Sequence, residues 1–310
     1  MRPAVYIPNF NGAARLGATL RGLAEQTVAV DVVLADNGSS DGSVELARQE
    51  LPAVRVVELG ENLGFGPALN RAVAAHPAEA LILLNNDAVP EPRFVEALLD
   101  GLGAGVDSVA GVMTQERAPE LIDSAGVVAD ATLMGFDYLH GEAVGAAAGA
   151  PDPLGPTGGA ALYRHQAFAA VGGFDERIFL YYEDLDLALR LASAGSHCRL
   201  APEARAVHAY SASLGAASAG KYARTGWSRG YLLRRYGVMR SPRLALRALA
   251  CEGALCAGQL LKDRTASGLR GRWRGWRAAS GLALRDASGA PLLDLSAREA
   301  LTLRRRRRGP

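Results

Sequence analysis

Short amide and carboxylate side chains follow four apolar runs within the first 100 residues of this chain. These side chains could together bind one polar ligand. The four groups are Pro8-Asn9 with Asn11, then Asp36-Asn37, then Asn62, and last Asn85-Asn86-Asp87. Any one group is commonly just turn chemistry, because Asn, Asp and Gly favour loops for local reasons. Their repetition after four successive runs indicates a shared binding site.

The apolar runs alternate with segments of helical periodicity, which is the pattern of an α/β fold. Strand-like and helix-like segments follow one another at 3–8, 13–26, 31–36, 39–51, 54–59, 66–76 and 80–85. Near-continuous apolar strands joined by helices predict a mostly parallel sheet with helices on both faces. Ligands of such sheets bind beyond the carboxyl ends of the strands, so the polar groups are expected at one edge.

The sequence lacks the glycine patterns that bind phosphate directly. No GxGxxG follows the first strand, and the turn Gly64-Phe65-Gly66 is followed by Leu69 where a third glycine would be needed. No GxxxxGK(S/T) motif occurs either. Asp87, at the open end of a strand, instead offers a hard oxygen ligand of the kind that Mg²⁺ or Mn²⁺ prefers. The pattern therefore predicts a nucleotide site that relies on a metal ion.

Two adjacent carboxylates, Glu183 and Asp184, begin a helix-like segment in the second half of the chain. Leu185, Leu189 and Leu191 are the apolar positions that this helix is expected to bury. Acidic residues at a helix start have a structural explanation in the helix dipole and in capping. They can also act as a general base if a substrate hydroxyl lies within hydrogen-bond reach.

The chain resembles family 2 glycosyltransferases of the GT-A fold, and the rhamnosyltransferase-like bacterial members most of all. The motifs that carry the resemblance, over roughly residues 4–240, are VYIPNFNG, VLADNGSSDGS, ENLGFGPALNRA, LILLNNDAVPEP and GGAALYRHQAFAAVGGFDERIFLYYEDLDLALRLASAG. The resemblance implies a Rossmann-like GT-A domain over 1–220. Its nucleotide-sugar half would be 1–100 and its acceptor half 101–220.

The resemblance also implies a role for each motif. The nucleotide sugar is expected to contact Pro8, Asn9, Asn11, Asp36, Asn37, Asn62, Asn85 and Asn86. Mg²⁺ or Mn²⁺ is expected on Asp87, Asn85 and His208, although Asn85 stands where the fullest family motif has Asp. Asp184 is implied as the base, and Glu183 is expected to orient it or to contact the acceptor. Gly158 and Gly159 are implied to let the backbone approach the acceptor sugar.

Charge is distributed unevenly along the chain. Residues 221–310 hold 21 Lys and Arg against 5 Asp and Glu, whereas residues 1–220 hold 13 against 27. Residues 221–303 have the periodicity of basic amphipathic helices, and Trp273 and Trp276 lie among their arginines, which is typical of a surface that meets anionic lipid. A pair of helices packed on the acceptor half is the structural alternative. Residues 304–310 are expected to be disordered.

Other features bear on the compartment. No window reaches about 18 uninterrupted apolar residues and no signal peptide is evident, so no membrane-spanning helix is expected. The three cysteines, Cys198, Cys251 and Cys256, lack zinc-site spacing and cannot all pair within the chain. They favour packing roles in a reducing compartment.

The resemblance, taken with these features, implies an inverting, metal-dependent glycosyltransferase at the cytoplasmic face of a bacterial plasma membrane. The expected donor is dTDP-rhamnose or, second, a UDP-sugar, and the expected acceptor is a cell-envelope glycan or a lipid-linked intermediate. One alternative is a metal-dependent nucleotidyltransferase, which the missing glycine-rich, basic N-terminal signature disfavours. The other is a non-catalytic nucleic-acid-binding module built on the basic C-terminal region, and we expect no nucleic acid partner.

Overall fold

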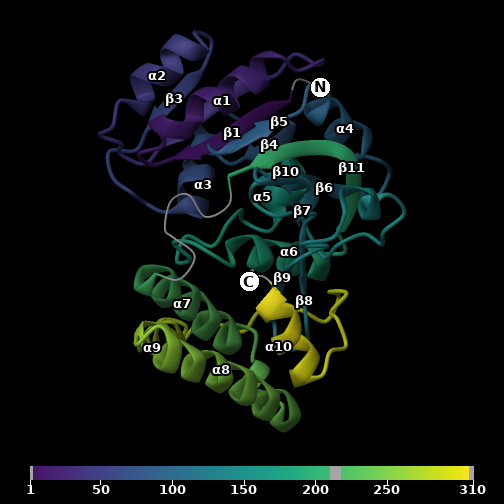
Figure 1. The fold of residues 1–310 in the computed structure, drawn as a ribbon. Coiled ribbons are helices and arrows are strands. Elements are labelled where there is room, and N and C mark those ends of the chain that lie inside the picture. The colour runs from purple at the N-terminus through teal and green to yellow at the C-terminus, as the bar shows by residue number, and fades with distance from the viewer. Residues whose placement is uncertain (1–2, 210–217, 307–310) are drawn as a thin grey trace.

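The computed structural model describes residues 3–209 and 218–306, and its centre is a nine-stranded sheet within these residues. The strands of this sheet are β1 (Ala4–Asn9), β2 (Asp31–Asp36), β3 (Arg55–Glu58), β4 (Ala80–Leu84), β5 (Ala88–Pro90), β6 (Val106–Gln115), β7 (Ala118–Ser124), β10 (Ala160–Arg164) and β11 (His197–His208). β8 (Val127–Ala129) and β9 (Gly135–Asp137) pair separately. Figure 1 shows the main sheet in the upper part of the molecule and the last helices below it.

The strand order places the polar strand ends at one edge. The order is β3-β2-β1-β4-β10-β6-β11-β5, with β7 beside β6. β1 to β4 pair in parallel, and their register sets Asn9 beside Asp36. β10 then runs antiparallel to β4 and sets Ala160 beside Leu84, so the loop before β10 meets the residues after β4. The backbone N–H of Asn85 donates to the carbonyl of Gly159 at 3.3 Å.

Helices cover both faces of the sheet, as the sequence predicts. α1 (Ala13–Ala24), α2 (Ser43–Glu50) and α4 (Phe94–Asp100) pack on one face, and α3 (Phe65–Ala75), α5 (His165–Ala170) and α6 (Glu183–Ser193) pack on the other. Side chains alternate between the faces along each strand. Val5 and Ile7 accordingly contact the first set of helices and Tyr6 the second.

The C-terminal helices share a hydrophobic core with α6 and the segments near it. They are α7 (Ala219–Arg235), α8 (Pro242–Lys262), α9 (Ser267–Ala278) and α10 (Ala297–Arg306), and short 3₁₀ turns lie at η1 (Val144–Ala147) and η2 (Val238–Arg240). One buried cluster joins Leu185 and Leu189 of α6 to Tyr231 of α7 and Ala248 of α8. The region 221–303 therefore packs on α6 and on residues near it, as the structural alternative to a free lipid-binding surface expects.

α7 and α9 approach each other closely because both present glycine at the contact. Gly226 and Gly230 of α7 face α9, and Gly271 and Gly275 of α9 face α7. A methyl group built on Gly230 would overlap the backbone carbonyl of Arg272. Small residues spaced four apart allow two helix backbones to approach in this way.

Replacing Gly230 with Ala is expected to destabilise the protein, because the added methyl group meets backbone that can move only if α7 and α9 separate. Overpacking of this kind costs about 1–3 kcal/mol. Gly253→Ala is the matched control: a methyl group there meets nothing within 4 Å, so the better helix propensity of Ala should stabilise α8. Thermal unfolding of both variants measures the difference. A Gly230→Ala protein as stable as wild type would show that the two helices have room.

The prediction that residues 304–310 are disordered is wrong for residues 304–306. α10 continues through Arg306, and Arg304 Nη1 donates to the carbonyl of Gly135 at 2.9 Å. This tertiary partner, which lies 169 positions earlier in the chain, extends the helix into the arginine run. Residues 307–310 lie outside the described part of the chain.

α8 departs from the expectation that the chain has no helix able to span a membrane. By length and composition this 21-residue helix could cross a membrane, with a mean hydropathy of 1.4 in its most apolar stretch. Arg247 and Glu252 interrupt it, so a search for uninterrupted apolar runs does not find it. Only 22% of that stretch is buried within the protein.

Candidate active site

Asn9 ties together the ends of β1, β2 and β4. Its Nδ2 donates to Asp36 Oδ1 and to Ser43 Oγ, both at 2.9 Å, and its Oδ1 accepts from Asn86 Nδ2 at 2.8 Å. Asn9 and Asp36 are both buried. Their side chains therefore hold the strand ends in place, and nucleotide contacts are expected from the backbone and from exposed neighbours such as Asn11.

A cavity of about 340 Å³ opens beyond the carboxyl ends of β2 and β3. It is lined by Asp36, Gly38, Ser39, Gly42, Ser43, Val44, Glu45, Arg48, Glu58 and Gly60. The backbone N–H of Asn11 donates to Ser39 Oγ at 2.9 Å, so the turn after β1 borders the cavity. The cavity lies at the edge where the sequence predicts the nucleotide. Asp87 and Asp184 are not among its lining residues.

The loop ENLGFG is held between the turn after β2 and the segment before α6. Asn37 donates from Nδ2 to the carbonyl of Gly64 at 3.3 Å, and Asn62 Oδ1 accepts from the Gly64 N–H at 3.1 Å. The next backbone N–H, of Phe65, donates to the carbonyl of Phe179 at 2.8 Å. Gly64 has a φ of +96° and lies against Phe179, so a side chain here would be both strained and obstructed. The loop thus connects the predicted donor site to the segment before α6.

Asp87, shortly after β4, and His208, the last residue of β11, form a second group. His208 Nε2 lies 3.3 Å from Asp87 Oδ1 and 3.3 Å from Asn85 Nδ2. On the other side of the ring, Nδ1 lies 2.7 Å from Asp123 Oδ2. Asp87 and His208 are 14% and 13% exposed, so a ligand could still reach them. The fold therefore brings together the three residues assigned to the metal by resemblance.

Asp87, Asn85 and His208 could hold a divalent cation only together with further ligands, such as the oxygens of a diphosphate. Asp123 forms a hydrogen bond with His208 Nδ1 and so orients the ring with Nε2 toward Asp87. Carboxylates commonly orient metal-binding imidazoles in this way. Burial opposes charging of His208, but its hydrogen bonds to Asp123 and Asp87 outweigh burial and raise its pKa to about 10. A metal ion binds neutral imidazole and would have to displace this proton. Within residues 3–209 and 218–306, no three His, Cys, Asp or Glu side chains are placed to hold an ion, so phosphate oxygens would have to supply further ligands.

Glu183 and Asp184 begin α6 directly after a strained turn. Tyr181 and Tyr182 have φ values of 70° and 71°, which is uncommon outside glycine and clusters at functional sites. Glu183 is buried, and burial together with the neighbouring Asp184 carboxylate raises its pKa well above the ordinary value. Asp184 is partly exposed, and its Oδ1 accepts from the Leu185 N–H at 2.7 Å. Asp184 is thus the accessible carboxylate of the pair, and Glu183 is suited to remain a neutral acid.

Gly158 and Gly159 lie close to side chains of the protein itself. A methyl group on Gly158 would lie 2.7 Å from the Phe65 ring, and one on Gly159 would lie 2.8 Å from both Asn85 Nδ2 and Met113 Sδ. Close approach by the acceptor sugar is therefore not needed to explain these glycines. Their contact with an acceptor stays a prediction.

Asp186 anchors α6 to the C-terminal region. Its fully buried carboxylate accepts from Arg190 Nε at 2.9 Å, Arg285 Nη1 at 2.5 Å and the Tyr236 hydroxyl at 2.9 Å. Arg285 also pairs with Asp175 at 2.9 Å. The helix that begins with Glu183 and Asp184 is therefore held in place by side chains from after α7 and after α9.

Sequence reasoning missed Asp123, Ser43 and Arg285. Asp123 has one local signal, a carboxylate at the end of the apolar pair Leu121-Ile122, but no motif connects it to His208. Ser43 lies within the recognised stretch DNGSSDGS without being singled out. Arg285 is one of many C-terminal arginines, and only the fold distinguishes it.

A match to a protein-family model identifies the family of this chain. The model for glycosyl transferase family 2 matches residues 4–172, more than half of the chain. The chain belongs to glycosyl transferase family 2. The match includes every strand-end motif and the Gly158-Gly159 loop, and it ends before α6. The nucleotidyltransferase and nucleic-acid-binding alternatives are not favoured.

Curated relatives of this family 2 glycosyltransferase include proteins named for rhamnose transfer. The N-acetylglucosaminyl-diphospho-decaprenol L-rhamnosyltransferase of Mycobacterium tuberculosis is 33% identical over an alignment of 203 residues that covers 58% of this chain and 66% of the relative. The succinoglycan biosynthesis protein ExoA of Rhizobium meliloti is 31% identical over 199 residues, covering 62% of this chain and 58% of that protein. The rhamnosyltransferase WbbL of Escherichia coli is 45% identical over a shorter stretch of 47 residues, 15% of this chain and 18% of WbbL.

Solved glycosyltransferases share the fold. A mannosyltransferase of Pyrobaculum calidifontis, solved with GDP-Man and Mn²⁺, aligns over 90% of this chain and 84% of its own with a TM-score of 0.54 and 20% identity. GalNAc-T7, solved with UDP, GalNAc and Mn²⁺, aligns over 81% of this chain and 51% of its own with a TM-score of 0.60 and 13% identity. At these identities the likeness concerns the fold alone. The predicted GT-A fold is confirmed.

Proposed function

We propose that this family 2 glycosyltransferase moves a sugar, rhamnose as the first candidate, from a nucleoside-diphosphate donor to a hydroxyl of a cell-envelope glycan or a lipid-linked acceptor. The observation that carries the proposal is the Asp87–His208 pair at the same sheet edge as the Asn9–Asp36 turn. The relatives named rhamnosyltransferases support the choice of sugar. dTDP-rhamnose is the first candidate donor and a UDP-sugar the second.

Asp184 is the proposed base. It removes the proton from the attacking acceptor hydroxyl, whose oxygen bonds to the anomeric carbon from the face opposite the diphosphate, so the sugar configuration inverts. Glu183, kept neutral by burial, is suited to donate a hydrogen bond to the acceptor or to Asp184. Asp87 and His208, with Asn85 beside them, would hold Mg²⁺ or Mn²⁺, which would neutralise the charge that develops on the leaving diphosphate.

The proposed place of action is the cytoplasmic face of a bacterial plasma membrane. The Mycobacterium tuberculosis relative is named for a lipid-linked sugar, N-acetylglucosaminyl-diphospho-decaprenol. An acceptor of that class would bring the reaction to the membrane surface. Nucleotide sugars are the matching donors on the cytoplasmic side.

A panel of nucleotides tested by thermal shift checks the donor class. We expect dTDP-rhamnose with Mg²⁺ or Mn²⁺ to raise the melting temperature more than other nucleotide sugars do, and EDTA to reduce the shift. A ligand at a hundredfold excess over its Kd stabilises by about 2.7 kcal/mol, which is readily measured. Nucleoside triphosphates serve as the control for nucleotidyl transfer. A shift with triphosphates and with no nucleotide sugar would contradict the proposed donor.

A further inference from the structure

α8 carries an exposed apolar stripe along its outer face. The exposed residues between Arg243 and Lys262, which we call the α8 stripe, are Leu246, Leu249, Ala250, Gly253, Ala254, Ala257, Leu260 and Leu261. The two charged residues within this span, Arg247 and Glu252, are not exposed. The four leucines are 56–79% exposed. At a rise of about 1.5 Å per residue the stripe is roughly 23 Å long.

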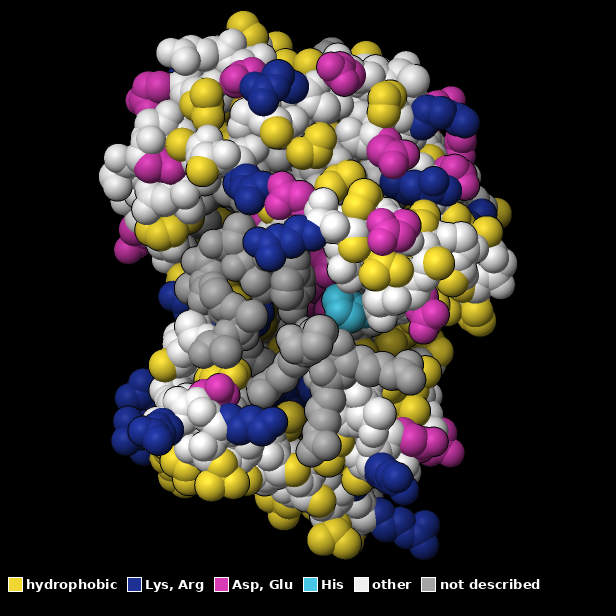
Figure 2. All heavy atoms as spheres, viewed as in Figure 1, with side chains coloured by type: hydrophobic (Ala, Val, Ile, Leu, Met, Phe, Trp, Pro, Cys, Tyr) yellow, Lys and Arg dark blue, Asp and Glu magenta, His cyan; other side chains and the backbone are white. Residues whose placement is uncertain are grey.

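The surroundings of the α8 stripe are cationic. Arg243 lies at one end, Lys262 and Arg264 lie at the other, and α9 exposes Arg270, Arg274 and Arg277. The carboxylates between residues 241 and 280 are Glu252 and Asp263. Glu252 is buried in ion pairs, and Asp263 accepts from the Tyr222 hydroxyl at 2.7 Å. Figure 2 shows hydrophobic side chains along the lower edge of the molecule, where α8 and α9 lie in Figure 1, with Lys and Arg side chains around them.

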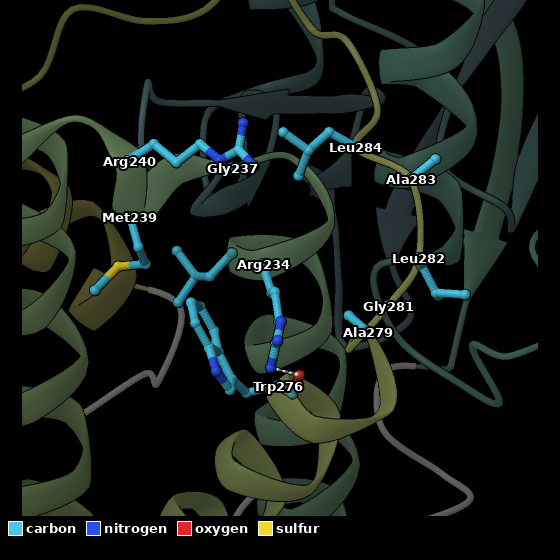
Figure 3. A pocket seen from close by; sticks show the side chains of 11 residues that line it. Arg234, Gly237, Met239, Arg240, Trp276, Ala279, Gly281, Leu282, Ala283 and Leu284 are labelled. Carbon is cyan, nitrogen blue, oxygen red and sulfur yellow. Dashed lines mark hydrogen bonds between the residues drawn. The ribbon is translucent and has the colours of Figure 1, made fainter.

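The two tryptophans of α9 have different surroundings. Trp276 lines a cavity of about 570 Å³ between α7, η2 and α9, where the guanidinium of Arg234 lies 5.2 Å from its ring centre (Figure 3). Arg234 also donates from Nη1 to the Trp276 carbonyl at 3.2 Å. Trp273 is 63% exposed. Of the pair that the sequence assigned to a membrane surface, Trp273 alone is largely exposed.

Ion pairs on the inner face of α8 oppose its leaving the protein to span a bilayer. Glu252 pairs with Arg229 at 2.6 Å and with Arg272 at 2.5 Å, and Arg247 pairs with Asp130 at 2.7 Å. A spanning helix would carry Glu252 and Arg247 into hydrocarbon without these partners. Burying an unpaired charge costs several kcal/mol. α8 is therefore expected to keep its inner face on α7 and α9.

We propose that the α8 stripe lies in the plane of an anionic membrane, with its leucines inserted at the boundary between headgroups and acyl chains. The flanking arginines and Trp273 would contact lipid phosphates and headgroups, as in amphipathic helices that lie on membranes. A second copy of the chain is the competing occupant. An isologous contact through α8 would set cationic ends against cationic ends, which disfavours it. The inference rests on the proposed place of action and deepens it by naming the surface that contacts lipid, and membrane binding in this mode needs no substrate.

Vesicle flotation of the full chain without substrates tests the inference. Wild type is expected to bind phosphatidylcholine vesicles that contain phosphatidylglycerol, to bind pure phosphatidylcholine at least tenfold more weakly, and to bind less as salt rises. Replacing Leu246, Leu249, Leu260 and Leu261 by Gln should reduce binding at least tenfold. Removal of the chain after Gly237 is avoided, since it would also remove Arg285 and the Glu252 ion pairs.

The matched control carries Phe10→Gln and Val89→Gln, which change exposed apolar residues of the other half of the molecule. It should bind vesicles as wild type does. Thermal unfolding verifies that the stripe variant is folded. Equal binding by a folded stripe variant, or no binding by wild type, would overturn the inference. So would a wild-type dimer in sedimentation that the stripe variant converts to a monomer, since that result assigns the stripe to a second copy.

Discussion

Turnover is expected to fall about a hundredfold or more when Asp184 is replaced by Asn, because the acceptor hydroxyl then loses its base. Asn has the same size and can still accept the hydrogen bond from the Leu185 N–H, so the start of α6 should be preserved. Donor binding should change little, because Asp184 is placed in the acceptor half. Transfer kinetics give the turnover, and the thermal shift with donor and metal gives the binding.

Glu183→Gln is the matched control for Asp184. Gln resembles the neutral acid that burial favours at position 183, so it should cost much less turnover. It should also leave the fold intact, because the Glu183 Oε2 makes no hydrogen bond within the described residues. A larger loss in Glu183→Gln than in Asp184→Asn would move the base to Glu183.

Asp87→Ala is expected to abolish metal-dependent turnover. Asp87 is the only full negative charge in Asn85-Asn86-Asp87, and its carboxylate faces His208 Nε2 at 3.3 Å. An ion that neutralises the leaving diphosphate matters more in the transition state than for resting donor binding. Turnover should therefore fall further than donor affinity. A titration of transfer activity with Mn²⁺ and Mg²⁺ measures the effect.

Variants around Asp87 should form a graded series. Asn85→Ala removes a neutral amide and should cost less than Asp87→Ala. His208→Ala should raise the metal concentration needed for half activity. Asp123→Asn should do the same more weakly, because Asp123 contacts the far nitrogen of the ring and acts by positioning it. Full activity in the presence of a chelator, or a wild-type metal response in Asp87→Ala, would show that the cation does not bind at this site.

The elements of the first half were predictable because their signals are local. β1, β2 and β4 are apolar runs, and β3 has two valines between Arg55 and Glu58. Each helix between these strands has a periodic apolar face. Polar residues at the strand ends then follow from the rule that parallel strands share a carboxyl edge. Asn9, Asp36 and Asn86 meet in the fold for this reason. The sequence does not show that Asn9 is buried and that its side chain is hydrogen-bonded to other side chains of the protein.

The start of α6 was predictable from sequence, but its supports were not. Leu185, Leu189 and Leu191 are buried as their spacing predicts. The strained Tyr181-Tyr182 turn has no sequence signal, because non-glycine residues at positive φ are held there by surrounding contacts. The ion pair of Asp186 with Arg285 joins residues 99 positions apart. Many arginines could have made that pair.

By itself, the sequence determined the α/β class, the family, and the polar positions from which the site is built. These properties depend on local periodicity and on the residue types that follow each strand. The tertiary structure alone decided that β10 inserts beside β4, that Asp123 lies behind His208, and which face of α8 stays uncovered. Such features depend on contacts between distant segments. A periodic pattern shows that a helix has an apolar face, whereas the packing of the whole chain decides what covers it.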